Sequence, residues 1–85
     1  MKIITPSECL SKLVHFNKKV ERIQLNEYSN PRFRTADLNR LKWDIKLVQY
    51  WCSIAVHNKN KERADIIVKE SSQNYLVARR LLNIN

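Results

Sequence analysis

Two cysteines and two histidines are the side chains of this 85-residue chain best suited to binding a transition metal. Cys9 is followed by His15, and Cys52 is followed by His57. On a helix these spacings point the two side chains of each pair more than about 100° apart, whereas the ligands of a structural zinc site lie together on one face or turn. Both cysteines also fall in apolar repeats, where a free cysteine acts as a small hydrophobic residue. We therefore expect no metal site.

A catalytic centre needs a nucleophile, a base and a group that orients the base, and the sequence brings no such set together. Glu62 and Asp65 are neighbours on one helical face, but acidic side chains at that place typically stabilise a helix N-terminus. The chain contains no glycine, which excludes the glycine-rich loops that bind nucleotide phosphates. We expect a protein that is not an enzyme and that takes no cofactor or small-molecule substrate.

Sixteen Lys and Arg against eight Asp and Glu give the chain a formal charge of +8, and such an excess suggests attraction to phosphate. An ordinary solvated surface in a lysine-rich chain explains the same excess. We therefore keep nucleic-acid binding, including binding as a dimer, as the alternative function, with Phe33 or Trp43 available for base stacking. The cations that could follow a phosphate backbone are Lys12, Lys19, Arg22, Arg32, Arg34, Lys42, Lys46, Arg79 and Arg80.

Three helices must position these side chains, and the first is expected over residues 6–27. Thr5 and Glu8 form a capping box, with Pro6 at the first helical position. The pattern lapses before Asn30, which is pushed out of the helical region by Pro31. The apolar repeat of this helix is Cys9, Leu13, Phe16, Val20 and Ile23.

The second helix is expected over residues 36–57 with Thr35 as its cap, and the third over residues 61–82. The second helix has two apolar stripes on nearly opposite sides, which predicts burial on both. One stripe is Leu38, Leu41, Ile45, Val48, Cys52 and Ala55, and the other is Trp43, Leu47, Tyr50 and Ile54. The third helix repeats Ala64, Val68, Ser71, Tyr75, Ala78 and Leu82, and its polar stretch over residues 71–74 is the place for a kink.

Two antiparallel registers follow from these stripes. The first places Cys9 opposite Cys52 and Ile23 opposite Leu38, and it centres on the Asn30–Pro31 turn. The second places Trp43 opposite Tyr75 and centres on Lys59. We expect an all-α fold of three antiparallel helices in two successive hairpins, within one domain over residues 1–85, with the central helix buried on two faces. The first register also predicts that oxidation would link Cys9 and Cys52 within one chain.

Such a layer leaves more apolar side chains than its core needs, and aromatic side chains are enriched in binding hot spots. Our first functional hypothesis is a small regulator or adaptor that self-associates or docks on another protein. The residues expected at its interface are Leu10, Val14, Leu25, Trp43, Tyr50, Trp51, Ile66 and Leu76.

The chain shows no stretch of about 20 apolar residues, so we expect no membrane span. Residues 1–4 carry too few apolar side chains before Pro6 for a signal peptide. Two cysteines without a secretion signal suggest reduced thiols, and the expected compartment is the cytoplasm.

Overall fold

Four helices and no strand make up residues 3–83, the part of the chain that the computed structural model describes. They are α1 (Pro6–Leu25), α2 (Pro31–Asp44), α3 (Val48–Ala55) and α4 (Lys61–Leu81). The all-α prediction is confirmed, and the first and third predicted helices correspond to α1 and α4. The predicted second helix is two helices, α2 and α3, and it begins five residues earlier than expected. None of the described helices has an apolar stretch long enough to span a bilayer.

Polar side chains accept hydrogen bonds from the free amides at the starts of three helices, α1, α2 and α4. Thr5 Oγ1 accepts from the amide of Glu8 at 3.2 Å, as its place before Pro6 predicted. Asn30 Oδ1 accepts from the amide of Arg32 at 2.9 Å, so the cap of α2 is Asn30 and the prediction of Thr35 is wrong. The physical reason is the same as at Thr5: a capping side chain directly before proline starts a helix, because proline tolerates the first helical position.

The break between α2 and α3 falls at Ile45–Leu47. The amide of Lys46 donates to the carbonyl of Trp43, and the amide of Leu47 donates to the carbonyl of Asp44, so this turn is wound more tightly than an α-helix. Asp44 is the last residue of α2, where the helix dipole disfavours a negative charge. Lys19 of α1 binds the Asp44 carboxylate and offsets that cost.

The chain pairs α1 with α2 and α3 in the predicted first register. Lys19 pairs with Asp44 and Arg22 pairs with Asp37, each within two positions of the predicted partner. The buried side chains on both sides of this interface come from the predicted seams. They are Cys9, Leu13, Phe16, Val20, Ile23, Leu41, Val48 and Ala55.

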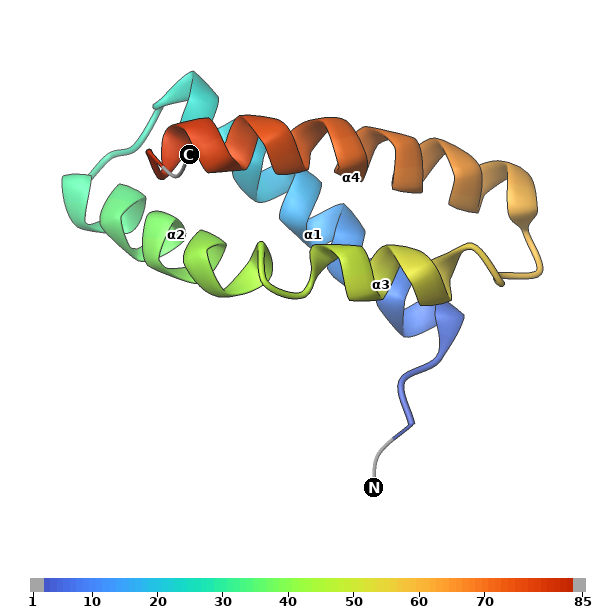
Figure 1. The fold of residues 1–85 in the computed structure, drawn as a ribbon. Coiled ribbons are helices and arrows are strands. Elements are labelled where there is room, and N and C mark those ends of the chain that lie inside the picture. Colours follow the sequence, from blue (N-terminus) through green and yellow to red (C-terminus); the bar gives the residue numbers. More distant parts are fainter. Residues whose placement is uncertain (1–2, 84–85) are drawn as a thin grey trace.

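The central helix is α1, not the predicted second helix. Figure 1 shows α1 crossing behind both α3 and α4, which run in opposite directions in front of it. Asn74 of α4 donates its Nδ2 hydrogen bond to Oδ1 of Asn17 on α1 at 2.9 Å. The heptad-spaced small residues of α4, Ala64, Ser71 and Ala78, are fully buried and allow α4 to approach closely.

The prediction that the second helix is buried on two faces is therefore wrong. In its second stripe, Trp43, Leu47 and Tyr50 are exposed, and Ile54 alone packs against the core. Small side chains on α4 fit against α1 more closely than against a row of aromatic rings, and this decides where α4 packs. The expected kink or break in residues 71–74 is not found: α4 is continuous there, although Ser71 and Ser72 donate to carbonyls one turn earlier, a bond that often bends a helix.

Candidate protein-binding groove

A groove of about 390 Å³ lies between α3 and α4. All of its lining residues come from these two helices, and Figure 1 shows α1 behind both. The exposed side chains Gln49, Ser72 and Leu76 reach its edges. The complete set of residues around the groove is Val48, Gln49, Cys52, Ser72, Tyr75 and Leu76.

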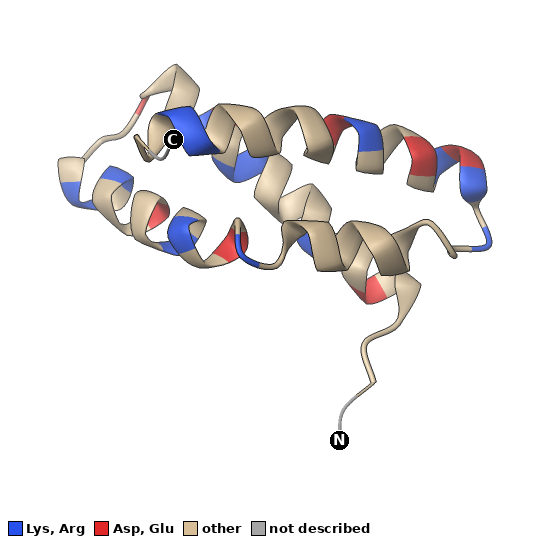
Figure 2. Ribbon diagram, in the orientation of Figure 1, with Lys and Arg blue, Asp and Glu red and all other residues tan. Residues whose placement is uncertain are grey.

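Both walls of the groove come from segments without charge. Residues 47–58 and 71–78 contain no Asp, Glu, Lys or Arg, in a chain with 28% charged residues. Figure 2 shows α3 and one stretch of α4 free of both charge colours, with charged residues on α4 to either side of that stretch. Depletion of charge is the compositional mark of the centre of a protein interface. The groove is therefore suited to bind apolar side chains.

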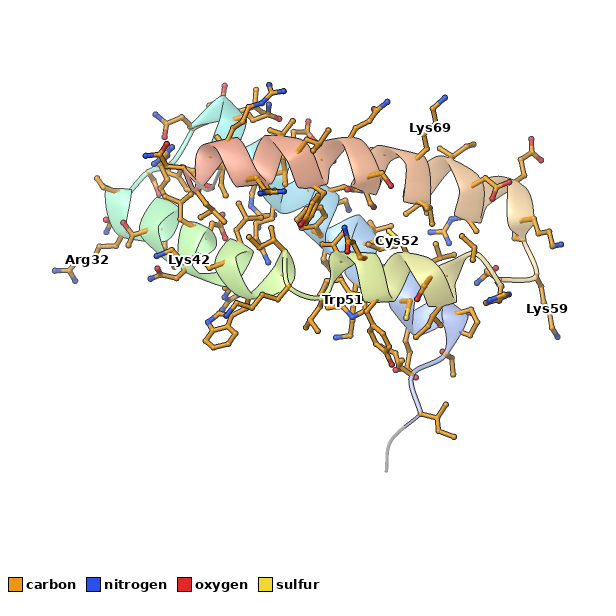
Figure 3. The ribbon with its side chains drawn as sticks, in the orientation of Figure 1. Arg32, Lys42, Trp51, Cys52, Lys59 and Lys69 are labelled. Carbon is orange, nitrogen blue, oxygen red and sulfur yellow. The ribbon has the colours of Figure 1, made fainter. Side chains whose placement is uncertain are left out.

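Cys52 gives the groove a thiol. Figure 3 shows Cys52 between α3 and α4, and its side chain is half-buried. Burial raises the pKa of this thiol above its ordinary value of 9.0, and the nearby Cys9 raises it further. Because both cysteines are free and the pKa of Cys52 is raised, the group is a neutral thiol at pH 7 and adds weakly polar surface to the groove.

One cation lies beside a residue that lines the groove, and a second precedes the other wall in the sequence. The guanidinium carbon of the half-buried Arg79 lies 5.8 Å from the centre of the Tyr75 ring. Lys46 precedes the other wall by two residues, and its Nζ lies 4.6 Å from the centre of the Trp43 ring. Lys69, on the same helix as Tyr75, points away from α3 (Figure 3). The groove thus combines an uncharged surface with a positive charge beside one of its lining residues.

The structure divides the eight predicted interface residues. Leu10 and Trp51 are 1% and 7% exposed and belong to the core, so their expected place on a docking surface is wrong. Figure 3 shows Trp51 on the side of α3 away from α4. Val14 is half-buried against the core. The exposed members are Leu25, Trp43, Tyr50, Ile66 and Leu76, and of these only Leu76 lines the groove.

The nine predicted cations differ in their partners and in their exposure to solvent. Lys19 and Arg22 are held by Asp44 and Asp37, and Nζ of Lys12 lies 5.7 Å from the centre of the Trp51 ring. Arg34 has a buried Nε without a hydrogen-bond partner among residues 3–83. Figure 3 shows Arg32 at the outer end of α2 and Lys42 further along that helix. The exposed cations of the set are Lys12, Arg22, Arg32, Lys42, Lys46 and Arg80.

The cysteine and histidine side chains do not form a cluster that could bind a metal ion within residues 3–83. His15 and His57 are exposed, Cys9 is buried, and no group of three or more His, Cys, Asp or Glu side chains within residues 3–83 is placed to hold a metal ion.

Sequence reasoning missed most of the groove. Val48, Cys52 and Tyr75 were assigned to helix-packing seams, and Gln49 and Ser72 were not singled out. The signal that could have found them is the pair of uncharged segments, since these are the two longest in the chain. Their meeting depends on the tertiary fold.

Comparisons of the chain with protein-family models, with curated proteins and with solved structures give no match. The site must therefore be interpreted from its own chemistry.

Proposed function

We propose that this protein is a small non-catalytic interaction module that docks on a partner protein through the α3–α4 groove. The observation that carries the proposal is the meeting of two uncharged segments around a groove of about 390 Å³ in a chain of charge +8. A surface of this kind costs solubility if it stays open to water, which favours a partner that covers it. The two free thiols suit a reducing compartment, and we propose the cytoplasm.

The choice between self-association and docking on another protein rests on charge. Two copies carry +8 each, and their repulsion opposes a homodimer at low salt. A different protein with a negative surface meets no such cost. Docking on another protein is therefore the function that we propose, and self-association is an outcome that the experiment detects.

The test compares two variants of the same helix. Leu76→Asp places a charge in the groove, whereas Ile66→Asp changes an equally exposed apolar residue outside it. We expect the full chain and Ile66→Asp to retain the same proteins from a nuclease-treated extract, and Leu76→Asp to lose them by tenfold or more, because a charge buried without a partner is costly. Equal retention by both variants, or a uniform dimer by light scattering that Leu76→Asp does not disturb, would contradict the proposal.

A second candidate function is nucleic-acid binding at the start of α2. The first turns of α1 and α4 carry Glu8 and Glu62, whereas the first turn of α2 carries no acid. Arg32 and Arg34 lie there instead, against the preference of the helix dipole. The unpartnered Nε of Arg34 and the nearby cavity of about 360 Å³ with Asn26, Tyr28 and Pro31 also favour an anionic ligand.

Salt dependence tests this second function. If the protein binds single- or double-stranded nucleic acid, the logarithm of the binding constant should fall linearly with the logarithm of the salt concentration. The double variant Arg32→Gln, Arg34→Gln should reduce the slope by about 1.4–1.8, and Lys59→Gln with Lys61→Gln at the other end of the molecule should leave it unchanged. The absence of retention at low salt would remove this function.

A further inference from the structure

We propose that the occupant of the α3–α4 groove is an amphipathic helix of a partner protein, with acidic residues beside its apolar stripe. The inference rests on the proposed docking function and specifies the partner. It follows from the shape of the groove and from the charges around it.

The shape of the groove favours a helix. Its walls are two helices, and residues 3–83 contain no strand edge to which an extended peptide could add. A groove whose walls are two helices is the kind of surface into which an amphipathic helix inserts side chains spaced three and four residues apart. Cys52 and Tyr75, which are half-buried, and the exposed Leu76 offer such side chains an apolar surface.

The charge around the groove favours an acidic partner. From Ile45 to Lys61 and from Ser71 to Asn83 the chain contains no Asp or Glu. The nearest acid before α3 is Asp44, whose carboxylate is already bound by Lys19. Glu70 directly precedes the second of these segments, and Lys69 directly precedes Glu70, so these two charges offset each other. Arg79 is the cation that the structure places beside a lining residue, with its guanidinium carbon 5.8 Å from the centre of the Tyr75 ring. Carboxylates beside the apolar stripe of an incoming helix would complement Arg79.

A second copy of this chain fits the same groove poorly. Its exposed apolar side chains include Trp43, Leu47 and Tyr50, and Lys42 and Lys46 lie beside them in the sequence. Docking those side chains would bring these lysines toward Arg79, and like charges at an interface are unfavourable. The charge pattern thus selects a different, acidic chain.

Cys52 provides a direct measure of occupancy. It is half-buried at the groove, whereas Cys9 is fully buried, so alkylation of the folded protein should occur first at Cys52. A helix seated in the groove would cover the thiol and slow the reaction. The readout reports the groove itself and needs no knowledge of the natural partner.

The experiment uses the full chain and two synthetic helical peptides with the same leucine stripe. One peptide has glutamate beside the stripe and the other has lysine. We expect the glutamate peptide to slow alkylation of Cys52 at concentrations about tenfold lower than the lysine peptide, with a difference that shrinks as salt rises. Arg79→Glu should abolish or reverse this preference, whereas Lys69→Glu, on the same helix but pointing away from α3, should preserve it. Circular dichroism of both variants checks that they remain folded.

The outcomes separate this inference from the proposed function. Equal protection by both peptides, or a preference unchanged by Arg79→Glu, would overturn the acidic partner while leaving the groove as a docking site. Failure of both peptides to protect Cys52 would overturn the inference. If Leu76→Asp and Ile66→Asp also retain the same proteins from an extract, the docking function fails with it.

Discussion

The carboxylate of Asp37 accepts three hydrogen bonds from side chains. It accepts from Nε and Nη2 of Arg22 at 3.3 and 3.4 Å, and from the hydroxyl of Tyr28 at 2.7 Å. These bonds link α1, the following connection and α2. Burial alone would raise the pKa of Asp37, but the bonds from Arg22 and Tyr28 together outweigh it and hold the pKa below its ordinary value of 3.8.

The lowered pKa of Asp37 makes this contact sensitive to acid. A carboxylate whose folded-state pKa is below its unfolded value stabilises the folded state above about pH 4, and the contribution is lost as the pH falls through the folded pKa. Asp37→Asn should lower the free energy of unfolding by about 1–2 kcal/mol at pH 7, because the Arg22 partner is half exposed and the Tyr28 bond is an ordinary one.

Urea denaturation at pH 7 and pH 3 checks the role of Asp37. The difference in unfolding free energy between the two pH values should be smaller in Asp37→Asn than in the unchanged protein. Asp65→Asn, at an exposed position on α4, serves as control. The same pH dependence in both variants would contradict the assignment.

At the scale of the elements, helix ends are formed without glycine. Thr5, Asn30 and Asn60 cap three helix starts with a side-chain oxygen. Asn26 ends α1 in the left-handed region, with φ 54° and ψ 34°. Asparagine tolerates this conformation better than other residues with a side chain, because its short polar group can bond locally. Asparagine therefore takes the place that glycine holds in most proteins.

Substitutions at Asn26 should report this conformation. Asn26→Gly should leave the free energy of unfolding unchanged or raise it slightly, because glycine adopts positive φ without cost. Asn26→Val should lower it by about 1–2 kcal/mol, because a β-branched side chain is disfavoured there. Thermal and chemical denaturation compare the two. Equal stability of the variants would show that the left-handed turn is not needed in solution.

At the scale of the whole molecule, α1 packs against each of the other three helices. α1 buries the predicted seam against α2 and α3, and it buries Leu10 and Asn17 as well. Because α4 packs on α1, Trp43, Leu47 and Tyr50 stay exposed, and a groove remains that is lined by α3 and α4. The arrangement that completes the core is therefore also the one that leaves the proposed docking surface.

The two tryptophans provide a matched test of this arrangement. Trp51 is 7% exposed and packs in the core, whereas Trp43 is 69% exposed. Trp51→Ala should lower the free energy of unfolding by about 3–5 kcal/mol, and Trp43→Ala by no more than about 1 kcal/mol, the size of its contact with Lys46. Denaturation curves measure both. If burial of the second stripe were the true arrangement, the two losses would be comparable.

The amino-acid sequence by itself determined the helices and the first register. Capping side chains before proline, apolar repeats and the Asn30–Pro31 turn are local signals, and a short connection leaves two helices few ways to pair. Two local features were nevertheless not predicted. The cap of α2 was missed because Asn30–Pro31 was interpreted only as the end of the first helix. The turn at Ile45–Leu47, which divides α2 from α3, was also missed. This turn depends on contacts between α1 and the end of α2, which the local pattern does not contain.

Tertiary structure alone decided which helix is central and where the candidate site lies. The apolar repeat of one amphipathic helix can be aligned with that of any other in some register. From the sequence alone, the repeat of α4 therefore matches the second apolar stripe of the predicted second helix as well as it matches α1. Packing decides that α4 lies against α1. Ala64, Ser71 and Ala78 allow close approach to α1, and Asn74 forms a hydrogen bond with Asn17. This arrangement brings the uncharged segments of α3 and α4 together, and a groove between distant segments exists only once both are in place.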